Sequence, residues 1–206
     1  MPRIDAATVA EHHAQQRRAL LDAARALLAQ TGEAPSMGAV GQRVGLARSS
    51  VYQYFDSAEE LLTAVVTEVF PSWAEHILTK VAAAPTAGSR VWAYVEANID
   101  LFASSEQAVA RALTRVVNPQ VLHGPMQDFH AQLQVPLREA LRDLGEPDPD
   151  AMAEHVNSLI MQASRDLEAA ERSARATLRT QTLGRLHRLL RGYLSLSDHL
   201  PVESPD

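Results

Sequence analysis

The chain has 206 residues, no cysteine, a hydrophobic fraction of 46% and a formal net charge of −6. This length allows one large domain or two modest ones, and the hydrophobic fraction excludes a disordered chain. The lack of cysteine excludes disulfides, thiolate metal sites and a cysteine nucleophile. The longest apolar runs fall far short of the ~20 residues of a membrane helix, and the N-terminus lacks the apolar core of an export signal, so we expect a cytoplasmic protein that does not enter a membrane.

The charge is distributed unevenly along the chain. Residues 1–55 contain six arginines and four acidic residues, whereas residues 56–206 contain 13 basic and 21 acidic residues, a net charge of −8. A mildly basic segment on an acidic chain is compatible with a nucleic-acid partner, although one such segment alone would bind weakly.

A long first helix is expected from about residue 5 or 8 to residue 30, and a helix-turn-helix follows it. The two short helices of this motif cover residues 36–44 and 47–54. Gly45 ends the first of them because glycine tolerates left-handed backbone geometry. Gly41 is small where the two helices approach closely. The apolar residues that face inward are Met37, Val40, Val44 and Val51.

The second helix of such a motif is held so that its exposed face enters a DNA major groove. Here that face carries, in chain order, Arg48, Ser49, Ser50, Tyr52, Gln53 and Tyr54. Arginine can bind guanine, glutamine can bind adenine, and serines suit phosphate contacts. The ring of Tyr52 either fills the core or leaves its hydroxyl for DNA, whereas Tyr54 is expected to be exposed. Arg17 and Arg18 of the first helix either contact phosphate or point into solvent.

The rest of the chain is also helical in its periodicity, and no segment alternates as a strand does. A fourth helix begins at Ser57, which has capping-box spacing with Glu60. Further helices are expected at about residues 88–103, 105–117, 125–144, 149–171 and 174–194. The predicted fold is therefore all-α, with a three-helix head, a larger helical body and about nine helices.

Several breaks are expected between and within these helices. Pro71 should kink or interrupt the fourth helix, and Pro136 should kink the seventh. A loop is expected over residues 118–125 and a linker over residues 145–149. Residues after about 196 have the pattern of a frayed tail.

The last two helices differ in charge and share wide apolar stripes. Residues 139–171 contain nine acidic residues, and residues 172–192 contain six arginines and no acid, so an antiparallel pair would be complementary. The stripes are wide enough to pack on the body and on a second subunit. The dimerisation candidates are Val156, Leu159, Ile160, Ala163, Leu167, Leu183, Leu186 and Leu190.

Aromatic and polar residues of the body are candidates for a ligand cavity. Core packing, or solvent exposure for the polar ones, is the alternative. His123 and His130 lie seven residues apart, but a metal site needs three or four converging ligands, so neither a metal nor a cofactor is expected. The ligand candidates are Trp73, Trp92, Asn98, Phe102, Met126, Phe129, His130, Leu133 and Gln162.

Residues 17–66 resemble the N-terminal part of the tetracycline-repressor (TetR) family. The resemblance rests on RRALLDAARALLAQTG, SMGAVGQRVGLARSSVYQYF and DSAEELL, and most specifically on Tyr52 and Phe55 before the acidic capping box. It implies a dimeric repressor with a three-helix DNA-binding head, a connecting fourth helix, an inducer-binding helical body and a dimer interface formed by the last two helices. It also implies phosphate contacts from Ser36, the N-cap of its helix, and from Tyr52 and Tyr54.

Two positions depart from the family pattern. Ala47 stands where the family often has a serine or threonine cap, and Ala58 stands where it often has a lysine that contacts phosphate. Both departures should weaken contacts to the DNA backbone without changing the docking geometry.

The leading hypothesis is a ligand-responsive repressor that binds a palindromic operator in double-stranded DNA as a homodimer and is released by a small-molecule effector. Its DNA-binding domain would span residues 1–55, and its effector-binding and dimerisation domain residues 56–206. The alternative is a helical interaction module, or a regulator without a small-molecule ligand. An enzyme is not expected, because the sequence has no nucleophile elbow, Walker loop, HExxH or dinucleotide-binding glycine pattern.

Overall fold

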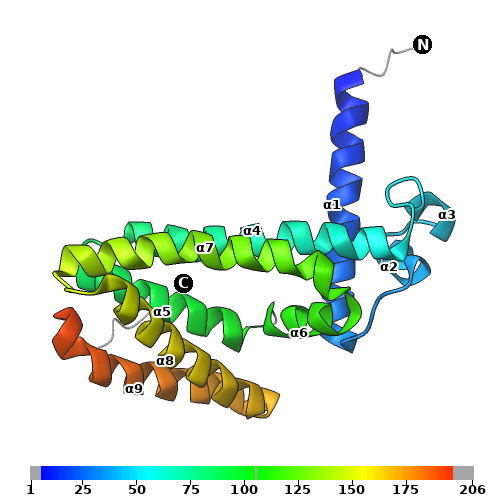
Figure 1. Cartoon of the computed structure of the whole chain (residues 1–206). Helices are drawn as coiled ribbons and strands as arrows, with labels where there is room; N and C mark the ends of the chain where they lie inside the picture. Colours follow the sequence, from blue (N-terminus) through cyan, green and yellow to red (C-terminus); the bar gives the residue numbers. More distant parts are fainter. Residues whose placement is uncertain (1–5, 105, 197–206) are drawn as a thin grey trace. The chain divides into compact units, whose positions relative to one another are not determined.

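The computed structural model describes residues 6–104 and 106–196, and this part of the chain is helical almost throughout (Figure 1). Within it there are nine α-helices, one short 3-10 helix and no strand, so the all-α prediction is confirmed. No helix in these ranges is long and apolar enough to cross a bilayer. The expected tail after residue 196 lies outside them. The elements are α1 (Ala6–Thr31), α2 (Met37–Arg43), α3 (Arg48–Val51), α4 (Ala58–Ala83), α5 (Ala87–Ala103), α6 (Glu106–Val116), α7 (Pro119–Leu144), α8 (Pro149–Ala169), η1 (Arg172–Ala174) and α9 (Arg175–Leu194).

The contacts divide the chain into two compact units. Unit 1 contains residues 1–70 and 106–126, and unit 2 contains residues 71–105 and 127–206. Helices α4 and α7 each contribute to both units. The functional boundary expected after residue 55 is a different division, and it stays a prediction.

Unit 1 is built around the apolar face of α1. Leu20, Ala24 and Leu28 are fully buried, and α1 packs on both α2 and α6. Arg25 of α1 also forms an ion pair with Glu106 at the start of α6. The apolar stripe that the sequence indicates over the second half of α1 is therefore the one that forms the core.

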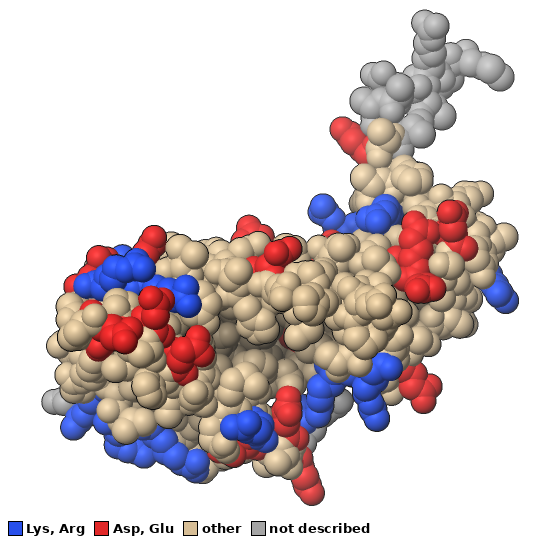
Figure 2. All heavy atoms as spheres, viewed as in Figure 1, with Lys and Arg blue, Asp and Glu red and all other residues tan. Residues whose placement is uncertain are grey.

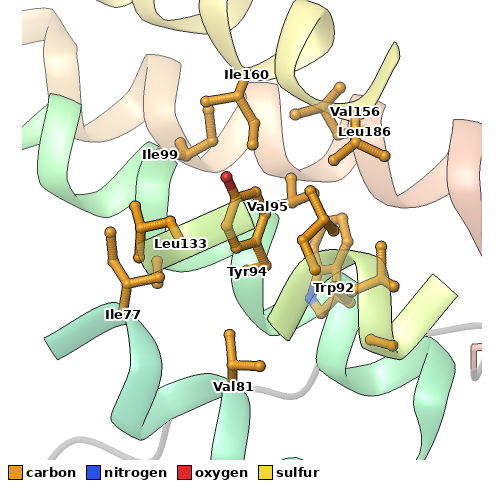
Figure 3. Packing of buried hydrophobic residues seen from close by; sticks show 14 of the residues in the cluster. Ile77, Val81, Trp92, Tyr94, Val95, Ile99, Leu133, Val156, Ile160 and Leu186 are labelled. Atoms are coloured by element: carbon orange, nitrogen blue, oxygen red, sulfur yellow. The ribbon is translucent and has the colours of Figure 1, made fainter. Parts of the chain in front are cut away.

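Helix α5 is the central helix of unit 2, where it packs on α8 and α9. Figure 3 shows its Trp92, Tyr94 and Val95 among apolar side chains of α4, α7, α8 and α9. Burial raises the pKa of Tyr94 to about 12, and its hydroxyl donates a hydrogen bond to Asn157 Oδ1 at 3.0 Å.

Asp100 of α5 connects three helices of unit 2. Lys80 of α4 approaches its carboxylate to 3.1 Å, and Arg179 of α9 approaches it to 2.6 Å. A partly buried carboxylate needs such partners, because its desolvation is otherwise costly. The sequence favoured acidic partners on α8 for the arginines of α9, but Arg179 binds α5 instead.

The proline-rich segments differ from expectation. Helix α7 begins at Pro119 rather than at Pro125, so the loop expected over residues 118–125 is wrong. Asn118 Oδ1 accepts a hydrogen bond from the backbone N–H of Gln120 at 3.0 Å, and proline in a first helical turn sacrifices no helical bond. Neither Pro71 in α4 nor Pro136 in α7 interrupts its helix. Pro71 is exposed, so water can reach the carbonyl that it leaves without a donor.

The start of α5 and the end of α9 approach so closely that position 88 requires glycine. A Cβ on Gly88 would lie 1.8 Å from the carbonyl oxygen of Leu194. We expect Gly88→Ala to lower the free energy of unfolding by about 1–3 kcal/mol or more, because backbone would have to move. Denaturant unfolding at fixed protein concentration, followed by circular dichroism, measures this. Gly124→Ala is the control: no atom lies within 4 Å of its Cβ in α7, so alanine should be neutral or stabilising there. Equal stabilities of the two variants would contradict the proposed close approach.

Candidate nucleic-acid interface

The helix-turn-helix predicted over residues 36–54 is present in unit 1. Ser36 caps α2 by accepting a hydrogen bond from the backbone N–H of Ala39 at 3.2 Å. Gly45 adopts a φ of 74° and ends the helix, and the N–H of Leu46 then donates to the carbonyl of Gly41 at 2.8 Å. These bonds form the tight turn that leads into α3, whose N-cap Ala47 provides no side-chain hydrogen bond.

Gly41 is the point at which α2 meets the turn and α3. A Cβ at this position would lie 2.7 Å from the carbonyl oxygen of Leu46 and 2.8 Å from Val51 Cγ2. Val51 is fully buried. The close packing predicted for Gly41 is therefore confirmed, and it holds α3 with one side against α2 and the opposite side outward.

The regular part of α3 is shorter than predicted. It covers Arg48–Val51, whereas residues 47–54 were expected to be one helix. After Val51 the backbone continues in tighter turns: the N–H of Gln53 donates to the carbonyl of Ser50 at 3.1 Å, and that of Tyr54 to Val51 at 3.0 Å. This 3-10-type pattern is common where a short helix ends.

The outward side of α3 carries the residues expected to face DNA. Arg48, Ser49 and Gln53 are exposed and Ser50 is half-buried. Tyr52 is 40% exposed, so its ring does not fill the core. Its hydroxyl accepts a hydrogen bond from the Arg48 guanidinium at 3.2 Å, which raises the pKa of Arg48 from an already high value. Arg48 and Tyr52 thus form a preorganised pair on the exposed surface.

Tyr54 is half-buried, contrary to the expectation that it is exposed. Its ring stacks on His13 of α1, with 4.5 Å between ring centroids and 26° between ring planes. Phe55, which is 1% exposed, is the aromatic residue of this segment that fills the core of unit 1. Sequence analysis overlooked His13, because nothing local to it indicates a partner in the helix-turn-helix.

Unit 2 contains most of the ligand candidates, and one group of them is packed together. Trp73 and Leu133 are buried, and the ring of Trp73 lies edge-on to half-buried Phe129, with centroids 6.4 Å apart. Phe129 also contacts His130, which is itself exposed. Phe102 is half-buried beside the same core.

The other ligand candidates lie elsewhere. Trp92 packs edge-on against buried His187 of α9, with centroids 5.1 Å apart. Asn98 is buried, but its amide donates to a backbone carbonyl one turn earlier in α5 at 2.8 Å. Met126 belongs to unit 1. Gln162 is exposed and hydrogen-bonds two neighbours on the surface of α8, so its expected position inside the body is wrong.

The dimerisation candidates need a similar correction. Leu159 and Leu190 are half-buried and pack against the core of unit 2, and the other six are buried in it. Their stripe faces α5 of the same protomer, so these six side chains are not available to a second subunit. The six are Val156, Ile160, Ala163, Leu167, Leu183 and Leu186.

Comparison with known proteins adds to this geometry. Residues 20–65 match the model of bacterial regulatory proteins of the tetR family. The chain belongs to the TetR family. The matched segment contains α2, the turn and α3, and a helix-turn-helix DNA-binding domain of this kind is that of a transcription regulator.

The fold agrees with that of solved TetR-family structures. A transcriptional regulator from Pectobacterium atrosepticum is 21% identical, with a TM-score of 0.64 and coverage of 90% of this chain and 97% of that one. The ketosteroid transcriptional regulator KstR2 of Mycobacterium tuberculosis is 17% identical, with a TM-score of 0.61 and coverage of 86% and 94%. SmeT, the repressor of a Stenotrophomonas maltophilia multidrug efflux pump, is 22% identical, with a TM-score of 0.57 and coverage of 92% and 96%. No curated protein matches the sequence.

The helix-turn-helix should be sensitive to any side chain at position 41. We expect Gly41→Ala to lower the stability of unit 1 by about 1–3 kcal/mol, because the methyl group would overlap the Leu46 carbonyl and Val51. Amide hydrogen exchange of residues 36–55 measures this locally. Gly38→Ala in the same helix is the matched control, since its nearest neighbour would be 4.0 Å away. Unchanged protection in Gly41→Ala would show that α2 and α3 have more room than the structure indicates.

Proposed function

We propose that this TetR-family regulator is a homodimeric repressor that binds a palindromic operator and is released from it by a small-molecule effector. It would act in the cytoplasm on the chromosome of its cell. The observation that carries the DNA-binding part is the exposed face of α3, which begins at Arg48 and is fixed to α2 at Gly41.

Each residue of this face has a proposed role. Arg48 would bind guanine and Gln53 adenine in the major groove, because their side chains match those base edges. Tyr52 would hold Arg48 in position through the hydrogen bond to its hydroxyl. Ser49 and Ser50 would contact phosphates, and Ser36 at the N-terminus of α2 would do the same. Tyr54 would act at the edge of this surface.

A second copy of the chain is the proposed partner of α8 and α9. Leu189 of α9 is 63% exposed and Met161 of α8 is 51% exposed, which is unusual for large apolar side chains. Arg185 and Arg188 are exposed on the same face of α9 as Leu189, and Figure 2 shows basic side chains gathered along α9. Glu154 is exposed on α8. A two-fold arrangement would therefore oppose the acidic α8 of one protomer to the basic α9 of the other.

Unit 2 is the proposed location of the effector. The aromatic group of Trp73 and Phe129, next to buried Leu133, suits a bulky, largely apolar ligand. KstR2 is described as a ketosteroid regulator and SmeT as the repressor of a multidrug efflux pump, and effectors of comparable bulk fit this proposal. The alternative is a regulator that responds to no small molecule.

Selection of duplexes from a random library by the purified chain tests the DNA-binding proposal. The expected product is a short inverted repeat with half-sites about one helical turn apart, roughly 34–36 Å. Arg48→Ala should weaken binding to this duplex by about 1–3 kcal/mol and relax selectivity at one base pair in each half-site. Tyr52→Phe should have a smaller effect, since it removes only the hydroxyl that holds Arg48.

Arg142→Ala, on the exposed surface of unit 2, removes one positive charge and should leave base selectivity unchanged. If the wild-type chain enriched no sequence at any salt concentration, the interaction-module alternative would replace the proposed repressor.

The dimer proposal predicts a specific effect of a charge at position 189. Leu189→Asp should weaken dimerisation about 100-fold, because the two-fold axis places the change in the interface twice. Sedimentation velocity over a range of protein concentrations measures this. Val135→Asp changes an equally apolar residue of α7 that is 55% exposed, and the dimer should tolerate it. A dimer unaffected by Leu189→Asp would have to use a different surface.

A further inference from the structure

The first half of α1 has no part in the core of unit 1. From residue 10 to residue 18 its side chains are exposed except for half-buried Gln16, and the buried stripe begins at Leu20. In Figure 1 this part of α1 stands clear of the other helices of unit 1. A helical extension that buries little apolar surface contributes little to folding, so its side chains are free for another role.

One stripe of this extension lies against the end of the recognition element. His13 stacks on Tyr54 with centroids 4.5 Å apart, and the guanidinium carbon of Arg17 lies 5.0 Å from the centroid of the Phe55 ring. The two α1 residues are four positions apart, which places them on one helical face. This face, defined by His13 and Arg17, is therefore contiguous with the segment that follows α3.

The chemistry of the face suits the DNA backbone. Arg17 is positively charged, and a guanidinium that covers an aromatic ring still presents N–H donors in its own plane. The imidazole of His13 has an N–H donor in either tautomer, and stacking on Tyr54 restricts its orientation. Both side chains can thus donate to phosphate oxygens.

Other cationic groups of unit 1 are engaged elsewhere. Arg25 is paired with Glu106, and Arg43 donates to Gln30 Oε1 at 3.0 Å. The two alanines at positions 47 and 58 provide neither a hydroxyl nor an ammonium group. Because half or more of the hydrogen bonds between proteins and DNA go to phosphate and sugar, a helix-turn-helix of this kind needs such donors from another element.

We propose that the His13 and Arg17 face of α1 is a second DNA-contacting surface, which binds phosphates next to the major groove entered by α3. Tyr54 acts as the positioning residue that holds His13 in place. This inference rests on the proposed operator binding, and it adds an element outside the helix-turn-helix to the interface.

Binding titrations on two duplexes test the inference. One duplex is the sequence enriched by the wild-type chain, and the other has the same length and composition in scrambled order. Arg17→Ala and His13→Ala should each weaken binding to both duplexes by a similar factor, about threefold to tenfold, because a phosphate contact carries no sequence information. Arg17→Ala should also reduce the slope of log affinity against log salt by about 1 for each half-site contact. Arg48→Ala should instead act mainly on the enriched duplex.

A substitution at His13 separates contact from packing. His13→Phe keeps an aromatic ring that can stack on Tyr54 but removes the N–H donor, so it should lose as much affinity as His13→Ala. His12→Ala and Gln15→Ala change exposed neighbours on other sides of α1 and are the matched controls. Circular dichroism and the melting temperature of each variant verify folding.

Wild-type affinity in His13→Phe would overturn the phosphate contact and leave His13 as packing alone. Losses in the controls equal to those in Arg17→Ala would overturn the specific face. In both cases enrichment of an operator by the wild-type chain would leave the proposed function intact. If the wild-type chain enriched no duplex, the proposed function would fail, and this inference would fail with it.

Discussion

The close approach of backbone at Gly41 is the constraint on which the DNA-facing side of unit 1 depends. Helix α3 has four residues of regular helix, far fewer than an isolated helix needs for stability in water. Its geometry must therefore come from α2, through the contact of Gly41 with the Leu46 carbonyl and buried Val51. With Val51 directed inward, Arg48 and Ser49 are directed outward, and the direction of the proposed base contacts follows from the size of one glycine.

The signals that predicted this part of the fold are local. Gly45 marks a left-handed backbone position, Ser36 caps the helix after it, and the apolar spacing of Met37 and Val40 gives the buried face. The environment of Tyr54 could not be predicted in the same way, because its partner His13 is far away in the sequence. Stacking between two exposed-type side chains leaves no periodic pattern.

Unit 2 shows a different limit of sequence analysis. Apolar periodicity correctly indicates that Val156 and Leu183 are buried, but it does not identify the surface that buries them. Their partner is α5 of the same protomer, and the proposed interface instead uses isolated exposed residues such as Leu189. Proline was overvalued for a related reason: Pro119 occupies a first helical turn, where its missing N–H has no consequence.

The continuity of α4 through Pro71 bears on how the proposed effector response would operate. One uninterrupted helix begins at Ala58 in unit 1, and in unit 2 its Lys80 is bound to Asp100 of α5. A helix of this length resists bending more than a kinked one, so a change in its packing near Trp73 would be carried along its axis rather than absorbed at the proline. Such a change alters DNA affinity only if the effector binds one position of α4 more tightly than the other. The ring contact between Trp73 and Phe129 is a place where such a preference could arise, because a ligand inserted there must separate two packed helices.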